Sequence, residues 1–486
     1  MIAAALFAFA LAAQGAPEIP SDDSKTTAIV AQDQAALRAS PRDAAESQVA
    51  LALGDALEIR GRAKDFIKVY DHRRERGGYV RASQVRVLTL TPDHAPELLA
   101  VARFLRDMPG YESLGIGYVA AYVAAAPADA IGAEPFDALG TMAERLARRA
   151  STNTNKARAP AITAQLEAVG AYGVVVKSFE RGERMQLCYD GEAFRRVLAL
   201  PGDAEAKARA ALALTREDCI DPAQTPTERA ALDAWRADVL DRVPRTDLPA
   251  HVRHRVRLRS AGVWASIAFE RARRGQDAID VGERALAELA GVDRRELADG
   301  DRVAYDEAAV RVGASRWASV PARPTPGAGL AITTSPGQPG ETCVTLVDRR
   351  RGKDTMLAKR CTFGIVWTAS QSANASGTAL ALAVQPLDGW RELWLFHRDA
   401  GEWRIDTAPP GVDGSLGYIE FAGWVPGGKK MLAAREVQSG QRIVKRFEVV
   451  DIATLAVDRH ADAPASLSLF YRWQDAAWKR ETVALR

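Results

Sequence analysis

Short runs in which apolar and polar residues alternate fill the chain from Ala35 to Leu88. The runs "VALALGDALEIRG", "DFIKVYD" and "GGYVRASQVRVL" alternate with a period of two, and Gly, Asp or charged residues separate them. This period, interrupted by turn residues, is typical of half-buried β-strands. Four or five short strands in so few residues predict a small β-barrel over 33–90.

Helical periodicity replaces the alternation from Pro96 to Val320. Apolar residues recur there every three or four positions, which places them on one face of a helix. One interruption, "YGVVVKSFERGERMQLCYDG", contains two β-rich runs around a turn. We therefore predict a mostly α-helical domain over 92–318 with a β-hairpin inserted near 173–190. The apolar faces are formed by Leu98, Val101, Leu105 and Met108, and by Phe136, Leu139, Met142 and Leu146.

A segment rich in Pro and Gly, "VPARPTPGAGLAITTSPGQPG", predicts a linker over 319–340. Strand patterns dominate beyond it, with a loose repeat that ends at Trp367, Trp424 and Trp473. Strand groups at this spacing resemble the blades of a β-propeller, and two blades and part of a third fit. Residues 341–486 are expected to form an antiparallel, propeller-blade-like β domain, which is an open propeller-like sheet, a sandwich built from it, or half of a dimeric assembly. The chain is thus predicted to be a multidomain α+β protein.

The N-terminus begins with an uncharged apolar run, Ile2 to Ala13, which is too short to cross a bilayer. Small residues before Gln14 suit cleavage, so we expect a signal peptide at 1–16 and a flexible linker at 17–32. A second apolar run, Leu114 to Ala126, is also short and predicts a buried helix. We expect no integral membrane span, and a bacterial protein that is periplasmic or secreted.

Four cysteines suit an oxidising compartment, where three disulfide connectivities are possible. We favour Cys188–Cys219 together with Cys343–Cys361. A hairpin folded about the middle of "CVTLVDRRRGKDTMLAKRC" places the second pair on opposing residues, close enough to bridge. None of the spacings matches a zinc site, and we predict no metal and no cofactor.

Charge and motifs exclude several classes of function. A net charge of +3 on 486 residues is too small for a dedicated nucleic-acid binder. The chain contains no nucleophile elbow, zinc-protease motif or phosphate-binding glycine loop. His251 and His254 lie close in sequence but lack a carboxylate at ligand spacing. Their segment predicts an amphipathic helix whose outer face carries Arg253, Arg257 and Arg259.

The order "LRASP", "GDALEIRG", "FIKVYD" and "GGYVRASQV" resembles bacterial Src-homology-3-like (SH3-like) domains. The chain departs from that family by carrying Phe66 and Tyr79 where tryptophan is usual. The resemblance covers about an eighth of the chain and implies a small barrel that contacts peptidoglycan or a peptide. The residues in matching places are Leu37, Arg38, Pro41, Gly54, Asp55, Val69, Gly78, Val80 and Val85.

The charged run from His72 to Arg76 would lie at a hairpin tip, where we favour a solvated turn over a contact with an anion. The candidate ligand-binding residues are Phe66, Tyr70, Tyr79 and Arg73. The two tyrosines could stack on sugar rings or peptide side chains, or they could complete a small core.

The preferred function is a non-catalytic, exported binding or scaffold protein of the cell envelope, whose partner is peptidoglycan or an envelope protein. The alternative is a cell-wall hydrolase of unrecognised type that uses the barrel for targeting. It would need convergent carboxylates in the helical region. A third hypothesis is an envelope protein that contacts anionic lipid through the basic helix. The tryptophans of the last domain could line a carbohydrate platform, but we favour a core position.

Overall fold

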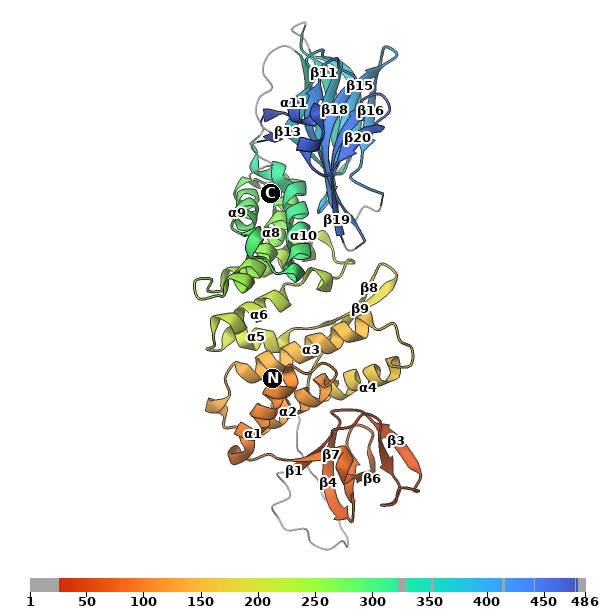
Figure 1. Cartoon of the computed structure of the whole chain (residues 1–486), viewed down its shortest axis with the longest axis vertical. Helices are drawn as coiled ribbons and strands as arrows, with labels where there is room; N and C mark the ends of the chain where they lie inside the picture. The colour runs from red at the N-terminus through yellow and green to blue at the C-terminus, as the bar shows by residue number, and fades with distance from the viewer. Residues whose placement is uncertain are drawn as a thin grey trace. The chain divides into compact units, whose positions relative to one another are not determined.

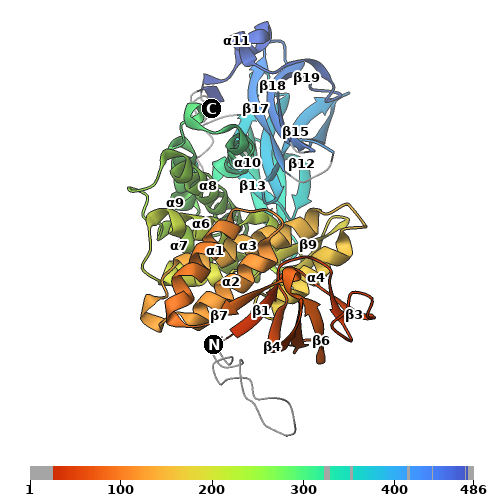
Figure 2. The same cartoon turned by 60° about the horizontal axis from the view of Figure 1, so that its bottom comes forward.

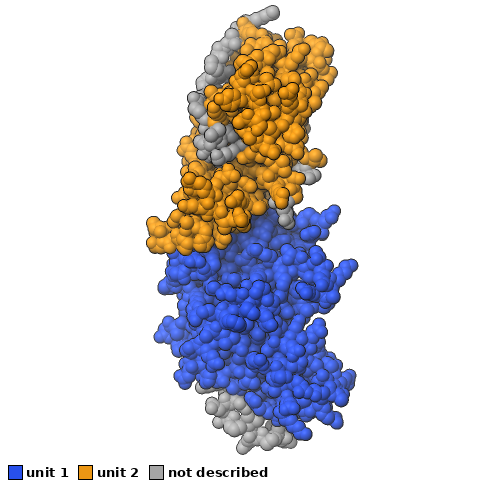
Figure 3. All heavy atoms as spheres, viewed as in Figure 1, with its two compact units in different colours: residues 1–224 blue, residues 225–486 orange. Residues whose placement is uncertain are grey.

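A computed structural model describes residues 26–321, 329–350, 354–412, 416–440, 442–476 and 478–479. The predicted signal peptide and residues 17–25 of the predicted linker lie outside this part of the chain. The chain divides into two compact units, residues 1–224 and 225–486 (Figure 3). We describe each unit by itself.

Unit 1 begins with a seven-stranded antiparallel sheet in the order β3-β2-β6-β5-β4-β1-β7. The inward residues of its strands, among them Leu37, Leu57, Val69 and Val80, form one buried cluster. The strands are β1 (Thr26–Val30), β2 (Ala35–Arg38), β3 (Ser47–Leu51), β4 (Ala56–Ala63), β5 (Phe66–Asp71), β6 (Arg76–Arg81) and β7 (Val85–Thr89).

The strand prediction for this region is confirmed in part. The described residues contain no pairing between the edge strands β3 and β7, so the sheet is open where a barrel was expected. The joint between β2 and β6 consists of one residue pair, Arg38 with Tyr79, because β2 is short. Strand β1 lies within the range predicted as linker. Its apolar residues Ala28, Ile29 and Val30 pair with β4 and β7 and are buried.

Helices complete unit 1, and Figures 1 and 2 both show α2 and α4 beside the sheet. Helix α2 is buried along most of its length, as predicted for the apolar run. The predicted hairpin is present as β8 (Val176–Arg181) and β9 (Arg184–Tyr189). The helices are α1 (Ala95–Arg106), α2 (Glu112–Ala125), α3 (Glu134–Thr152), α4 (Ala159–Gly170), α5 (Glu192–Ala199) and α6 (Ala204–Leu214).

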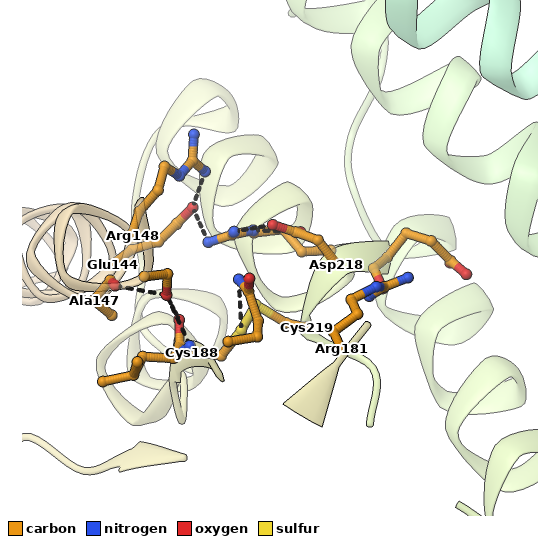
Figure 4. The surroundings of a disulfide bond; sticks show 12 residues. Glu144, Ala147, Arg148, Arg181, Cys188, Asp218 and Cys219 are labelled. Carbon is orange, nitrogen blue, oxygen red and sulfur yellow. Dashed lines mark hydrogen bonds and ion pairs between the residues drawn. A yellow bond between two sulfur atoms is a disulfide. The ribbon is translucent and has the colours of Figure 1, made fainter. Parts of the chain in front are cut away.

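A disulfide between Cys188 and Cys219 ties the hairpin to the segment after α6, as favoured from the sequence (Figure 4). The hairpin is also held on its other side, because Ser151 of α3 donates a hydrogen bond to the carbonyl of Leu187. Arg216 forms ion pairs with Glu144 of α3 and with Asp218. The disulfide and the ion pairs therefore both stabilise this region of unit 1.

The helices of the predicted range 92–318 are shared between the two compact units. The boundary between the units falls after Gln224, inside that region. The apolar faces of the earlier helices cover the N-terminal sheet, and those of the later helices share cores with the C-terminal strands. Unit 2 begins with α7 (Pro226–Asp241), α8 (Ala250–Arg273), α9 (Ile279–Ala290) and α10 (Asp299–Ser315).

The basic face predicted for α8 is not a solvated face. Arg253, Arg257 and Arg259 are half-buried, and Arg253 donates a hydrogen bond to the carbonyl of Leu248. Long α8 packs against both α9 and α10, which leaves little of its circumference to water. His254 is buried and His251 is exposed, so the two side chains point to different surroundings.

The C-terminal strands of unit 2 form two sheets. One has the order β10-β11-β12, and the other β13-β14-β15-β17-β18-β19-β20, with β16 on the edge of β15. They are β10 (Leu330–Pro336), β11 (Thr342–Asp348), β12 (Thr355–Thr362), β13 (Ile365–Ala373), β14 (Ala379–Leu387), β15 (Trp390–Asp399), β16 (Glu402–Ala408), β17 (Gly417–Val425), β18 (Lys430–Ser439), β19 (Arg442–Asp451) and β20 (Val457–Ala461).

Two features of these sheets differ from the prediction. Strand β10 occupies part of the predicted 319–340 linker, because its apolar residues Leu330 and Ile332 are buried against β14 and β15. The expected third repeat, at Trp473, is the short helix α11 (Ser468–Trp473). Its Phe470 is buried against β17–β19, so the segment covers the sheet rather than extending it.

The second disulfide joins Cys343 of β11 to Cys361 of β12. The two residues are directly opposite in the register, as the midpoint of their segment predicted. The hairpin they close covers one face of the larger sheet through Val344 and Leu346.

A buried ion cluster joins helix α10 to the sheet within unit 2. Glu420 of β17 accepts hydrogen bonds from Arg316 at 2.6 Å and from Arg391 of β15 at 3.0 Å. Arg391 also donates to the carbonyl of Gly313 at 2.7 Å. Burial raises the pKa of Glu420, but the two guanidinium groups outweigh it and hold that pKa below its ordinary value.

Candidate functional site

The three aromatic candidates for ligand binding lie on one face of the N-terminal sheet, which we call the outer face. Along β5, Ile67 and Val69 point into the buried cluster, so Phe66, Lys68 and Tyr70 point to the opposite side. Strand β6 alternates in the same way, with Val80 inside and Tyr79 outside. The period of two in the sequence therefore placed all three aromatic residues on one side.

Register brings these residues together. Tyr79 is directly opposite Lys68, and Tyr70 lies two residues further along β5. Directly opposed side chains of antiparallel strands lie on the same face, and diagonal neighbours are within reach of aromatic rings. Lys68 is therefore surrounded by Phe66, Tyr70 and Tyr79, with Arg38 beyond Tyr79 on β2.

Phe66 is not available to a ligand, although the sequence made it a candidate. Its side chain is 5% exposed, and the guanidinium of Arg81 lies 5.4 Å from the centre of its ring. Arg81 is in turn paired with Asp43 of the loop that precedes β3. The ring of Phe66 is thus buried beneath the ion pair between Arg81 and Asp43.

Tyr70 is half-buried and partly covered. The guanidinium of Arg60 lies 3.9 Å from the centre of its ring, an arrangement in which a cation is attracted to the ring face. Glu58 holds Arg60 through two hydrogen bonds of 3.2 Å and also contacts His72 at 2.7 Å. A ligand that stacked on this ring face would have to displace Arg60.

Tyr79 differs from Tyr70 in that, among the described residues, no cation lies over its ring. It is half-buried, and its neighbours across the strands are the long side chains of Lys68 and Arg38. The glycine before it is closely packed, since a Cβ at Gly78 would lie 2.8 Å from the carbonyl oxygen of Arg38. The backbone under Tyr79 is therefore tightly fixed, which holds the ring in place.

The charged run of the β5–β6 turn is exposed at His72, Arg73, Glu75 and Arg76, as favoured from the sequence, but two of its arginines are held in ion pairs. Arg73 pairs with Asp55 at 2.9 Å and with Glu167 of α4 at 3.1 Å. Arg74 pairs with Asp55 at 2.9 Å and with Asp71. The run thus joins the sheet to the helices, and the prediction that Arg73 contacts a ligand has no geometric support.

Backbone contacts also join the N-terminal sheet to the helices. Gly54 has a φ of 88°, and a Cβ there would lie 2.6 Å from the backbone of Ser113 in α2. Its carbonyl accepts a hydrogen bond of 2.6 Å from the hydroxyl of Tyr172, whose pKa is raised mainly by burial. Burial likewise raises the pKa of Asp55 despite its pairing with Arg73 and Arg74. These contacts therefore fix the sheet to the helices of unit 1.

Carboxylates converge in unit 2, as the hydrolase alternative requires, but they are engaged in packing. Asp233 of α7 pairs with Arg229 at 2.7 Å and with Arg236 at 2.6 Å, and it is buried. Asp388, between β14 and β15, accepts a hydrogen bond of 2.7 Å from Ser266 of α8. The pairs of Asp233 lie within α7, and the contact of Asp388 joins α8 to the turn between β14 and β15.

One carboxylate of this group, Glu270, has a raised pKa because of burial, which the nearby Asp388 and Asp233 reinforce against Arg274 and Arg273. Arg274 lies 3.6 Å from it. A general acid needs a raised pKa, but it also needs a second carboxylate that is free to act. Asp233 lacks that freedom because two guanidinium groups hold it.

The tryptophans of the last domain are mostly core residues. Trp367, Trp390, Trp394 and Trp478 are buried, and each belongs to a strand or to the C-terminal cover of the sheet. Trp473 of α11 is 40% exposed. Buried rings cannot line a carbohydrate platform, so the core interpretation applies to these four.

Among the described residues, one group of three side chains has metal-ligand types close together, namely Glu341, Cys343 and Cys361. The two sulfur atoms are bonded to each other in the disulfide, so neither is a thiolate that could bind a metal.

Comparison of the chain with family models, curated proteins and solved structures finds no match. None of the described helices combines the length and the hydrophobicity that crossing a bilayer needs. What the chain does must therefore be argued from its own geometry.

Proposed function

We propose that this chain is an exported, non-catalytic binding or scaffold protein of the bacterial cell envelope, and that its N-terminal sheet contacts peptidoglycan. One observation carries the proposal: Tyr70 and Tyr79 lie partly exposed on one face of a sheet whose buried cluster is complete without them. Rings that can pack on sugar or peptide atoms are thus held on a fixed support.

Other features are consistent with this function. The two disulfides fit an oxidising compartment, as the expected signal peptide would require. The SH3-like resemblance of residues 33–90 supports a small recognition module. In unit 2 the strands β13–β16 and β17–β20 form two successive antiparallel groups. The two groups share a buried cluster. This arrangement supports a propeller-like scaffold that binds a protein partner.

The experiment is retention of the full-length protein on purified peptidoglycan sacculi. The wild-type chain should sediment with sacculi, and Tyr70→Ala together with Tyr79→Ala should weaken binding about two- to tenfold for each ring lost. The matched control is Tyr111→Ala, because Tyr111 is 43% exposed but lies outside the sheet.

Equal retention of the wild type and the double variant would remove the outer face from the proposal, and no retention of the wild type would remove peptidoglycan. The hydrolase alternative predicts instead that the wild type releases soluble fragments from the sacculi and that Glu270→Gln abolishes the release.

A further inference from the structure

Lys68 lies at the centre of the outer face. It is exposed, it is directly opposite Tyr79, and Phe66 and Tyr70 are its neighbours two residues away on β5. The bulge in β4 places Gly61 opposite it on the other side. A Cβ built at Gly61 would lie 3.9 Å from the Cβ of Lys68, so glycine places no side chain next to Lys68 on that strand.

The other cations of this face already have acceptors. Arg60 is held by Glu58, Arg81 is paired with Asp43, and Arg38 donates a hydrogen bond of 2.8 Å to the carbonyl of Ala45. Within the part of the chain that the structure describes, the side chain of Lys68 has neither an ion pair nor a hydrogen bond. Its charge is therefore uncompensated in the middle of an aromatic surface.

We propose that Lys68 is the anion-binding centre of the outer face and that it binds a carboxylate of the peptide stems of peptidoglycan, while Tyr79 packs on the adjoining apolar atoms. This inference rests on the proposed function and names the part of the polymer that is recognised. Tyr79 is the packing ring because Arg60 already occupies the face of Tyr70.

The pattern of charge favours a single carboxylate over a polyanion. A polymer such as nucleic acid is bound by several cations that each neutralise a phosphate. Here the neighbouring guanidinium groups are matched by Glu58 and Asp43, which would repel a second negative group. An ammonium group is a compact point charge with three donors, which suits one carboxylate.

The test uses the full-length protein and fluorescently labelled soluble fragments of peptidoglycan, prepared with free stem carboxylates or with the same carboxylates converted to amides. Binding is measured by anisotropy for the wild type, Lys68→Gln and Lys68→Arg. The control is Lys177→Gln, which removes an exposed lysine from strand β8 of the same unit.

For the free-carboxylate fragment we expect Lys68→Gln to weaken binding about two- to fivefold, and Lys68→Arg and Lys177→Gln to leave it near the wild type. For the amidated fragment the wild type and Lys68→Gln should bind equally. Added salt should reduce the difference between them for the free-carboxylate fragment.

Several outcomes overturn the inference. If sacculi retain the wild type but Lys68→Gln binds the free-carboxylate fragment as tightly, the proposed function stands and the role of Lys68 does not. The same holds if amidation leaves wild-type affinity unchanged. If sacculi do not retain the wild type, the proposed function and this inference fail together.

Discussion

The two units present an instructive contrast in how β-sheets carry aromatic residues. In unit 1 the outer face of the N-terminal sheet keeps Tyr70 and Tyr79 in partial contact with water. In unit 2 the sheets bury most of their rings, among them Trp390 and Trp394. All ten tryptophans of the chain belong to unit 2, and seven of its ten tyrosines belong to unit 1.

The ion pairs that join helices to sheets also differ in their exposure to water between the two units. In unit 1, Asp55 is buried, but its partners Arg73 and Arg74 still reach water. In unit 2, Glu420 and both of its arginines are shielded from water. A sheet that is covered on both faces buries its aromatic and charged side chains in packing contacts. A sheet with one face open to water can use the same side chains to bind a ligand. This contrast supports the proposed binding site in unit 1 over one in unit 2.

The largest effect is expected from Glu420→Gln, which leaves Arg316 and Arg391 buried without a negative charge. Breaking a buried pair in this way costs about 3–5 kcal/mol of the free energy of unfolding. Urea unfolding should be followed by tryptophan fluorescence, which reports unit 2 alone. Glu402→Gln on exposed β16 serves as the control, and a loss no larger than the control's would show that the cluster is not a structural joint.

The disulfides offer a second comparison, because each unit has one. In the chain-entropy model, the closed loops of 31 and 18 residues each contribute about 3–4 kcal/mol. Cys343→Ser with Cys361→Ser should lower the urea midpoint seen by tryptophan fluorescence. Cys188→Ser with Cys219→Ser should leave that midpoint unchanged and increase amide exchange in β8 and β9. A shift of the fluorescence midpoint by the second pair would mean that the units unfold as one.

A smaller loss is expected from Asp55→Asn, which weakens the joint between the N-terminal sheet and the helices. A hydrogen bond to a charged group contributes about 1.5–3 kcal/mol, and the amide retains part of it. Hydrogen exchange read by mass spectrometry should speed up in β4, β5 and α4. Asp65→Asn, in the exposed turn between β4 and β5, is the matched control. Unchanged exchange in α4 would argue that Arg73 and Glu167 do not depend on Asp55.

The smallest change in stability is expected from Tyr70→Ala with Tyr79→Ala, at about 1 kcal/mol or less, because neither ring belongs to the buried cluster. Hydrogen exchange in β5 and β6 measures it. A loss of several kcal/mol would mean that these rings are core residues, and the contrast between the units would then disappear.

Several features could be read from the sequence because they depend on local order. The period of two placed Phe66, Tyr70 and Tyr79 on one side of the sheet. The midpoint of a hairpin placed Cys343 opposite Cys361, and an apolar run of helical length gave the buried helix α2. Each inference needs only the repeat of a strand or helix and the spacing of residues along it.

Tertiary structure decided the rest, because these features depend on which elements meet. The exposed turn from His72 to Arg76 could be predicted, but its ion pairs with Asp55 and Glu167 arise only where the sheet packs on the helices. No periodicity marks the division of the helices after Gln224, since an apolar helical face fits either neighbour. Likewise, the sequence does not show which cations of the outer face have acceptors. Only the structure shows that, among the described residues, Lys68 lacks one while its neighbours do not.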